Sequence, residues 1–193
     1  MREIALHLLD IAENSVAAGA HMIALAVCED LHRDRLTASV TDDGKGMDAE
    51  MVAKVVDPFI TSRTTRKVGL GIPLFKAAAE ACTGGLTIHS AVGKGTRLEV
   101  DFQHSHIDRM PLGDLASTLL TLVVAYPQIR WVFEYTAVVK KGAPRQQFIF
   151  DTQPIVAELG DISLTEPEVL TFLRETIETG IAQAQTALIN DRQ

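Results

Sequence analysis

The sequence predicts an α+β fold over residues 1–103, with an antiparallel-biased sheet and helices on one of its faces. Three observations support this class. Apolar residues recur at helical spacing between Glu3 and Ala18, pairs of short runs typical of strands follow, and turn-forming glycines separate these segments. Nine of the thirteen glycines lie in residues 1–103, whereas five of the seven prolines lie in 104–193, so the two parts differ in construction.

The first helix stops before Gly19, which suits a C-terminal cap, and a charged segment separates the two strands that follow. A short helix, a polar loop and a second long helix come next, and a glycine pair ends that helix. The expected bounds are helices 3–18, 49–56 and 72–82, strands 22–28, 36–41, 86–90 and 96–102, and a loop at 58–68.

Residues 104–193 are expected to form a small αββα subdomain, in which Trp131, Phe133 and Tyr135 alternate along one strand and share a face. Such an aromatic row indicates a core or a dimer contact. The chain is therefore expected to contain two domains, 1–103 and 104–193, the second of which binds a partner or a second copy. The expected bounds are helix 114–125, strands 130–140 and 146–151, and a helix capped by Thr165.

Composition and charge exclude several classes of protein. A chain of 193 residues with 47% hydrophobic and 22% charged residues has the composition of a folded globular protein. The net charge of -7 argues against nucleic-acid binding as the main activity. The longest apolar stretch, 119–126, is too short to span a bilayer, and the charged start does not fit a signal peptide. Since Cys28 and Cys82 suggest a reducing compartment, we expect a cytoplasmic protein with no membrane partner.

Four segments of residues 1–103 carry side chains that a plain core does not require. In the first, Asp10 and Asn14 lie four residues apart on the first helix and so share one of its faces. Their oxygens could hold a water molecule and a hard cation such as Mg²⁺. A solvated polar face is the alternative explanation.

The second segment follows a strand and has the sequence TDDGKGM from residue 41 to residue 47. Gly44 and Gly46 allow a sharp turn and let the backbone approach a flat ligand closely. Asp42, at the strand end, could accept a hydrogen bond from an exocyclic amine. An ordinary tight turn would explain these residues as well.

The third segment, 57–74, interleaves basic and hydroxyl residues and then reaches Gly69-Leu70-Gly71 at the start of a helix. Unpaired amides and the positive end of a helix dipole attract phosphate, and the preceding side chains suit a mobile lid. The fourth segment is the turn Gly93–Thr96. A solvated loop and a plain hairpin turn are the alternatives for these two segments.

Together the four segments resemble the ATPase clan that joins DNA gyrase, the large heat-shock chaperones, histidine kinases and MutL. LDIAENSVAAGA is similar to the first box of that clan, DDGKGM to the second, DPF to the phenylalanine box, VGLGIPL to the third glycine box and GKGT to the last. The resemblance covers about residues 1–103. It implies the Bergerat ATP-binding fold, a two-layer α/β sandwich in which ATP lies between the sheet's helices under a mobile lid.

The resemblance also implies roles for individual residues. Asn14 would bind the Mg²⁺ that bridges the phosphates, Asp42 would receive the adenine amine, and Thr96 would contact the base through its hydroxyl and a water molecule. Phe59 would anchor the lid in the core. The other implied nucleotide-binding residues are Gly44, Gly46 and Met47 in the second box, Arg63, Thr64, Thr65, Arg66 and Lys67 in the lid, and Gly69, Leu70 and Gly71 with their backbone amides.

Three residues depart from the clan's pattern. Asp10 occupies the place where hydrolysing members carry the glutamate that activates water and where histidine kinases usually carry asparagine. Its carboxylate is one methylene shorter and could act as a base through water, which is compatible with slow hydrolysis. Lys67 replaces a glycine of the third box and suggests a stiffer, more electropositive lid, and Ala17 weakens the analogy with repair proteins.

Two classes of function remain open. In the first, the protein is a Mg-ATP-dependent, kinase-like signalling component that phosphorylates a partner in trans, similar to anti-sigma-factor kinases or a split histidine kinase. In the second, it is a nucleotide-gated interaction module or a slow ATPase without kinase activity. A preceding phosphoacceptor module is not expected, because the first box begins within ten residues of Met1. A gyrase-like clamp is disfavoured because the chain is acidic.

The histidines outside these segments are expected to be structural. His7 shares a helix with Asp10 and is expected to be packed or half-exposed. His104 and His106 lie two residues apart and lack a third metal ligand, so a metal site there is disfavoured.

Overall fold

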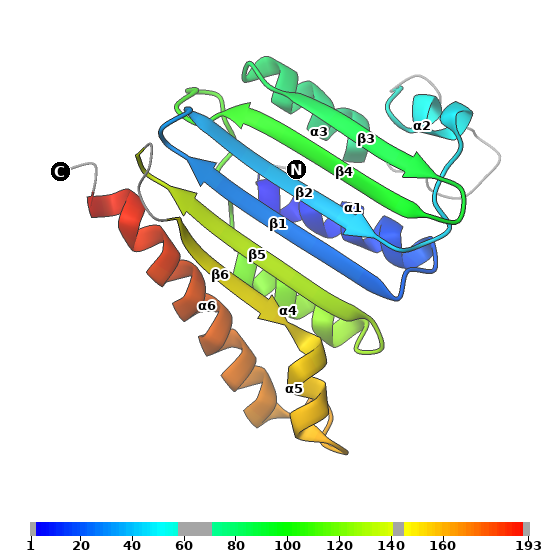
Figure 1. Cartoon of the computed structure of the whole chain (residues 1–193), viewed down its shortest axis with the longest axis vertical. Coiled ribbons are helices and arrows are strands. Elements are labelled where there is room, and N and C mark those ends of the chain that lie inside the picture. The colour runs from blue at the N-terminus through cyan, green and yellow to red at the C-terminus, as the bar shows by residue number, and fades with distance from the viewer. Residues whose placement is uncertain (1–2, 58–70, 141–144, 191–193) are drawn as a thin grey trace.

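A six-stranded mixed sheet forms the centre of the computed structural model, which describes residues 3–57, 71–140 and 145–190 (Figure 1). The helices and strands predicted within these ranges are present, and the loop expected at 58–68 lies outside them. The elements are α1 Ile4–Ala17, β1 Met22–Asp30, β2 Arg35–Asp42, α2 Ala49–Val55, α3 Gly71–Ala81, β3 Gly85–Ala91, β4 Gly95–Gln103, α4 Leu115–Ala125, β5 Arg130–Val138, β6 Gln146–Asp151, α5 Thr152–Leu159 and α6 Pro167–Asn190.

The strand order is β3-β4-β2-β1-β5-β6. The four strands of the first half pair antiparallel, as predicted, while β5 lies parallel to β1 with Phe133 opposite Leu25. β6 pairs antiparallel with β5 at the edge. Because a strand that joins a sheet at a distance needs a crossover connection, α4 carries the chain from β4 across the helical face to β5.

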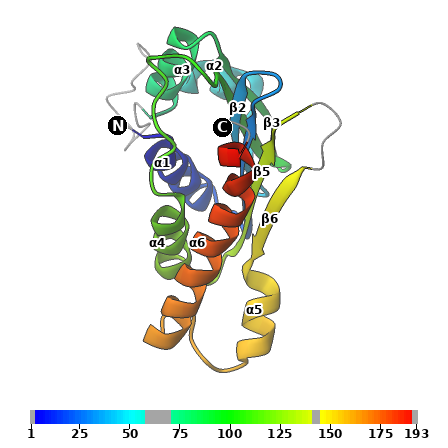
Figure 2. The same cartoon turned by 90° about the vertical axis from the view of Figure 1, so that its left-hand side faces the viewer.

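Four helices, α3, α1, α4 and α6, lie in this order across one face of the sheet (Figure 2). Side chains alternate along each strand, so Ile23, Leu25 and Val27 of β1 all point into this helical layer and are buried. Complete burial of such a side chain stabilises the fold by about 1.5–3 kcal/mol. The predicted two-layer α/β sandwich is therefore confirmed.

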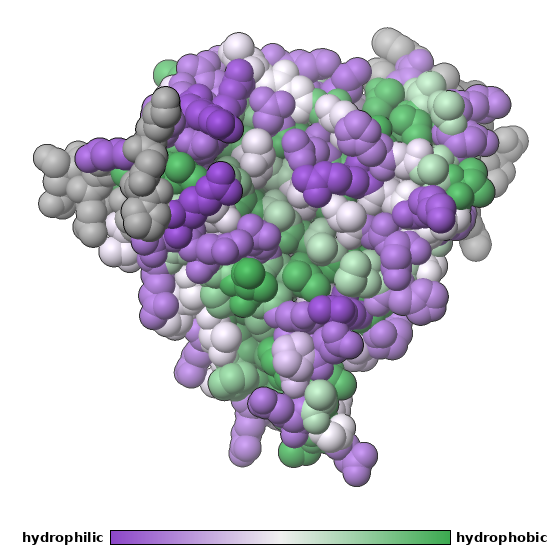
Figure 3. All heavy atoms as spheres, viewed as in Figure 1, coloured by the Kyte–Doolittle hydropathy of each residue, from purple (hydrophilic) through white to green (hydrophobic). Residues whose placement is uncertain are grey.

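The opposite face of the sheet is not covered by any helix of the described chain. Figure 3 shows hydrophobic side chains gathered over β1, β5 and β6 on this face, with hydrophilic side chains around them. Ala24, Ala26 and Val132 are half-buried there, while Ile149 on the edge strand is exposed. Because the apolar side chains on the central strands are small, apolar and hydrophilic surface alternate on this open face.

The second half of the chain continues the first sheet and the first core. β5 and β6 extend the sheet, and a single hydrophobic cluster runs from Ile4 to Leu188. Carbonyl oxygens of Pro111 and Leu112 accept hydrogen bonds from the first N–H groups of α1, at 3.0 and 2.8 Å, where no side chain caps the helix. The boundary expected at residue 103 thus marks the end of β4 and not a break in the sheet or the core.

The αββα order expected for residues 104–193 was wrong by one helix, because α5 follows β6 directly. Asp151 caps α5 by accepting a hydrogen bond from the Gln153 N–H at 2.9 Å, and Pro154 lies in the first turn, where its missing N–H costs no hydrogen bond. Trp131, Phe133 and Tyr135 are buried, so their predicted place in a core is confirmed. In the described part of the chain, no helix is long and apolar enough to cross a membrane.

A buried polar cluster also joins the two halves. The Tyr135 hydroxyl donates to Glu29 of β1, whose other carboxylate oxygen lies 2.7 Å from His104 Nε2. Burial opposes ionisation of Glu29, but these hydrogen bonds outweigh that effect and lower its pKa. His104 is therefore a structural residue, and the described ranges contain no group of three or more His, Cys, Asp or Glu side chains that could hold a metal ion.

His7 packs inside the helical layer, as predicted for a structural histidine. Its ring stacks on Phe75 of α3 with 4.4 Å between the centroids, and both side chains are buried. Burial lowers the pKa of His7 to about 4, and its Nδ1 atom has no hydrogen-bond partner among the described residues. The folded protein therefore holds His7 neutral.

We expect His7 to make stability depend on pH between its unfolded pKa near 6.5 and its folded pKa near 4. In this window the unfolded chain binds a proton that the folded chain excludes, so acidification lowers the free energy of unfolding by on the order of 2–3 kcal/mol. Urea unfolding of His7→Leu across this range should show a flatter profile. His32→Leu, which alters an exposed histidine, should keep the wild-type slope; parallel profiles for wild type and His7→Leu would contradict the assignment.

The backbone of the turn between β3 and β4 lies in close contact with the backbone at the end of β2. A Cβ atom on Gly95 would lie 1.9 Å from the Asp42 carbonyl oxygen, whereas a Cβ on Gly93 would meet no atom within 4 Å. Both glycines have positive φ angles, +82° and +73°. Gly95 is thus required by close backbone approach as well as by conformation, and Gly93 by conformation alone.

Gly95→Ala and Gly93→Ala should separate these two requirements. We expect Gly93→Ala to cost about 1 kcal/mol, the strain of a left-handed backbone, and Gly95→Ala to cost on the order of 3 kcal/mol because backbone atoms must also move. Urea unfolding with the midpoint and slope fitted separately measures both costs. Equal losses would show that the turn does not press on β2.

Candidate functional site

A cavity of about 250 Å³ opens at the end of the sheet where β2 finishes. Its walls come from segments that are distant in sequence: α1, the loop after β2, α2, the first turn of α3, and the strands β3 and β4. Apolar side chains form most of its surface. The lining residues are Ile11, Asn14, Ser15, Ala17, Ala18, Val40, Asp42, Lys45, Gly46, Met47, Met51, Val55, Ile72, Ile88, Thr96 and Leu98.

Asp42 is the buried carboxylate of this cavity. Its Oδ2 atom accepts a hydrogen bond from the Ser15 hydroxyl of α1 at 2.6 Å. Its Oδ1 atom accepts from the backbone N–H groups of Gly44 at 2.9 Å and Thr96 at 3.2 Å. A carboxylate has about four acceptor positions, so three protein donors leave one for a donor on a ligand.

The loop after β2 is fixed to the end of α1. The backbone N–H of Lys45 donates to the Ala18 carbonyl at 3.1 Å, and Asp43 Oδ1 accepts from the N–H groups of His21 and Met22 at 2.7 and 2.9 Å. Burial opposes ionisation of Asp43, but these two backbone donors outweigh it and lower its pKa. The glycine-containing loop therefore forms one wall of the cavity through backbone contacts.

Ser90 of β3 links that loop to the β3–β4 turn. Its hydroxyl accepts from the Met47 N–H at 2.8 Å and donates to the Gly95 carbonyl at 2.9 Å. The Thr96 hydroxyl lies 2.9 Å from the same Ser90 oxygen, and since the Ser90 proton is already used, Thr96 donates here. The lone pairs of the Thr96 oxygen are thus left to accept a hydrogen bond from the cavity side.

Asp10 of α1 lies beside the cavity, and its carboxylate approaches Gly71, the first residue of α3. A Cβ atom on Gly71 would lie 1.7 Å from Asp10 Oδ2, so only glycine allows the carboxylate to reach this helix start. Asn14, one turn further along α1, lies at the cavity surface. The two side chains therefore border the place where the N-terminus of α3 faces α1, and a helix N-terminus favours negative charge.

The structure brings together five residues that the sequence analysis proposed for one site, because Asn14, Asp42, Gly46, Met47 and Thr96 all line the cavity. Gly44 does not line the cavity, but its backbone N–H donates to Asp42. Asp10 and Gly71 are in close contact beside the cavity. The remaining proposed residues lie outside the described ranges: Phe59, Arg63, Thr64, Thr65, Arg66, Lys67, Gly69 and Leu70.

Sequence reasoning missed the residues that hold this site in place. Ser15 stands one residue after Asn14 in the first box, and its helical neighbours gave no reason to single it out. Ser90 and Lys45 carried no signal either, because their roles depend on strand pairing and on a loop that turns back to α1. The sequence analysis singled out Asp42 but gave no role to Asp43; in the structure Asp42 lines the cavity, and Asp43 binds the α1–β1 turn.

Two curated relatives share about half of this chain. A "Non-motile and phage-resistance protein" of Caulobacter vibrioides is 32% identical over 111 residues, which are 53% of this chain and 13% of that protein. A protein of Rickettsia conorii named sensor histidine kinase NtrY-like is 26% identical over 108 residues, which are 56% of this chain and 18% of that protein. The chain thus spans less than a fifth of the length of either relative.

The likeness to a solved structure extends further along the chain. The N-terminal domain of a DNA repair protein superposes with a TM-score of 0.50 at 11% identity, covering 96% of this chain and 58% of that one. At this identity the likeness concerns the fold alone, and it includes the second half. The profile of the family described as "Histidine kinase-, DNA gyrase B-, and HSP90-like ATPase" matches residues 1–106, more than half of the chain, and the protein is therefore a member of this ATPase family.

Proposed function

We propose that the cavity binds ATP with Mg²⁺ and that the protein acts in signalling as a kinase-like component on a partner protein. The observation that carries the first part is Asp42, a buried carboxylate with one free acceptor position at the floor of an apolar cavity. An exocyclic amine is the donor that fits this position, and adenine carries one where guanine carries a carbonyl oxygen. The site therefore favours adenine over guanine.

The other ligand groups follow from the positions around Asp42. Thr96 offers its oxygen beside the base, directly or through water, and Gly46 and Met47 lie on the same wall. The N-terminus of α3, whose second residue Ile72 lines the cavity, suits the phosphates. The carboxamide oxygen of Asn14 is a hard donor that fits Mg²⁺, and the ion would neutralise charge on the phosphates.

The kinase-like role rests on family membership and on the sensor histidine kinase among the relatives. In the proposed reaction, the γ-phosphoryl group leaves ATP for a hydroxyl oxygen or an imidazole nitrogen of the partner, which releases ADP and a proton. The described residues that line the cavity include no histidine, so a partner would supply an imidazole acceptor. The alternative is a nucleotide-gated interaction module. It is favoured if Asp10, whose side chain is one methylene shorter than glutamate, supports no ATP hydrolysis.

Asp42→Asn should abolish recognition of the adenine amine. The carboxamide oxygen has to face the backbone donors of Gly44 and Thr96, which turns its NH₂ group toward the ligand in place of an acceptor. We expect ATP affinity to fall about 100-fold by calorimetry with Mg²⁺, and the preference for ATP over GTP to disappear. Asp101→Asn, on the open face of β4, is the matched control and should bind as wild type. Unchanged ATP binding by a folded Asp42→Asn variant would refute the adenine assignment.

Asp10→Asn and labelled ATP should distinguish turnover from gating. We expect hydrolysis to slow about 100-fold while ATP affinity stays within about twofold, because Asp10 lies beside the cavity and not in its wall.

The proposed transfer is tested with γ-labelled ATP and a protein extract of the source organism, with Asp42→Asn as the inactive control. Label must appear on a second protein; if it stays in ATP while a complex forms only with ATP, the gating alternative holds.

A further inference from the structure

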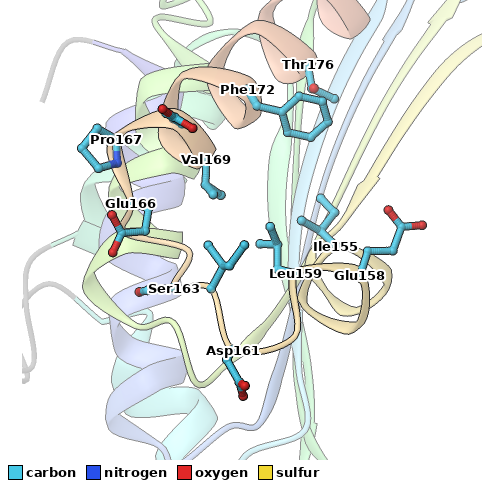
Figure 4. Close-up of a pocket in the computed structure, with 12 residues that line it drawn as sticks. Ile155, Glu158, Leu159, Asp161, Ser163, Glu166, Pro167, Val169, Phe172 and Thr176 are labelled. Atoms are coloured by element: carbon cyan, nitrogen blue, oxygen red, sulfur yellow. The ribbon is translucent and has the colours of Figure 1, made fainter.

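A second cavity lies away from the proposed nucleotide site, between α5 and the start of α6. It has a volume of about 1210 Å³ and is lined by the last turns of α5, the connection 160–166 and the first three turns of α6. Figure 4 shows Ile155 and Leu159 of α5 facing Val169 and Phe172 of α6 across this space. We call it the α5–α6 groove.

The floor of the α5–α6 groove is apolar and accessible. Six of its twelve lining residues are apolar, and among them Phe172 and Ile162 are each 57% exposed. The neighbouring side chains Leu173 and Ile177 on α6 are buried, so α6 satisfies its core contacts with another face. Large exposed apolar side chains in a concave surface mark a binding site for another molecule.

The margin of the groove is acidic. Four lining residues are Glu158, Asp161, Glu166 and Glu168, and no basic residue lines the groove in the part of the chain that the structure describes. None of these four carboxylates takes part in the ion pairs formed between described residues. Figure 4 places Glu158, Asp161 and Glu166 around the apolar side chains. The charge of this margin favours a cationic ligand and repels an acidic one.

The shape of the groove favours a helical segment over a small molecule. Its volume of about 1210 Å³ exceeds the roughly 300–1,000 Å³ of ordinary small-molecule clefts. The lining residues of α6 run from Pro167 to Thr176, a length of about 14 Å at 1.5 Å per residue. A partner helix presents apolar anchors at positions i, i+3 or i+4 and i+7 over about 10 Å, which this groove accommodates.

From this geometry we propose that the α5–α6 groove binds an amphipathic segment of a partner protein whose apolar face is flanked by Lys and Arg. Phe172 and Ile162 contact the apolar anchors, and the carboxylates at the margin pair with the flanking cations. The groove is formed by α5, the connection 160–166 and α6, and binding there requires neither nucleotide nor phosphoryl transfer. Failure of the groove proposal would therefore not count against the proposed nucleotide site.

The test uses the full chain and a fluorescent peptide of about 14 residues that contains only leucine, at helical anchor spacing, and lysine. We expect Phe172→Ala to weaken binding about tenfold by fluorescence anisotropy, as truncation of an aromatic anchor does, and Glu168→Lys to weaken it about as much. A peptide with glutamate in place of lysine should not bind. Higher salt should weaken binding of the lysine peptide.

Two matched controls make the result specific to the groove. Ile149→Ala removes an apolar side chain of similar exposure, 59%, from the open face of the sheet, and Glu175→Lys reverses an exposed charge on α6 outside the groove. Both variants should bind the lysine peptide within about twofold of wild type. Equal weakening by Glu175→Lys and Glu168→Lys, or equal affinity for the glutamate peptide, would overturn the proposal.

Sedimentation of the free chain tests the competing occupant, a second copy. A monomer at the peptide-binding concentrations supports the proposal, whereas a dimer that Phe172→Ala dissociates would assign the groove to self-association and overturn it. Circular dichroism and thermal unfolding establish that each variant is folded, which is expected because Phe172, Glu168 and Glu175 are all exposed.

Discussion

The candidate site depends on one buried carboxylate. Asp42 stands at the end of β2 and receives hydrogen bonds from α1, from the loop that follows it and from the start of β4. A buried charge without partners would cost several kcal/mol, so the fold must bring all these donors to the same place. Because the donors come from three separate segments, satisfying Asp42 fixes the helix, the loop and the strand relative to one another. The same arrangement leaves one acceptor position toward the cavity.

The helix that supplies the site is held at both of its ends by other parts of the chain. Ser15, near the C-terminal end of α1, reaches Asp42, and the first N–H groups of α1 are bound by carbonyls of Pro111 and Leu112. Those carbonyls belong to the connection that leads into α4. The second half of the chain therefore supports the site without lining it, through a cap on α1, a parallel strand beside β1 and α4 packed against α1.

The candidate nucleotide site and the α5–α6 groove differ in how their polar groups are satisfied. In the candidate nucleotide site, Asp42, Asp43 and Ser90 bind backbone groups, so the walls are formed before any ligand arrives. A preformed wall saves a ligand the entropic cost of ordering it. In the groove, the carboxylates lie at the margin and Phe172 is exposed, so both the charges and the apolar surface gain contacts when a partner binds. The first arrangement suits a small ligand of defined shape, and the second suits a protein segment.

Local sequence patterns were sufficient for the described helices and strands other than α5, and they singled out the candidate residues of the site. The helical period of residues 3–18 and the alternation of the strands depend only on neighbours in the chain, and so do the glycine boxes that share a resemblance with the ATPase family. The order of those boxes indicated that Asn14, Asp42 and Thr96 lie in one site, and the structure places all three around one cavity.

Tertiary structure decided what neighbours in the chain cannot show. The sequence of β5 has an aromatic face but does not state which strand it will join, and only the fold places it parallel to β1 and merges the two halves into one sheet. Ser15 binds Asp42, which is 27 residues away, and Ser90 binds the Met47 N–H, which is 43 residues away. Asp43 binds the N–H groups of His21 and Met22, which are 22 and 21 residues away, so all three roles follow from packing. The α5–α6 groove likewise exists only because the connection 160–166 turns the chain back after α5, so that α6 faces α5. Pairing between distant segments is a property of the whole chain, and for that reason no local pattern records it.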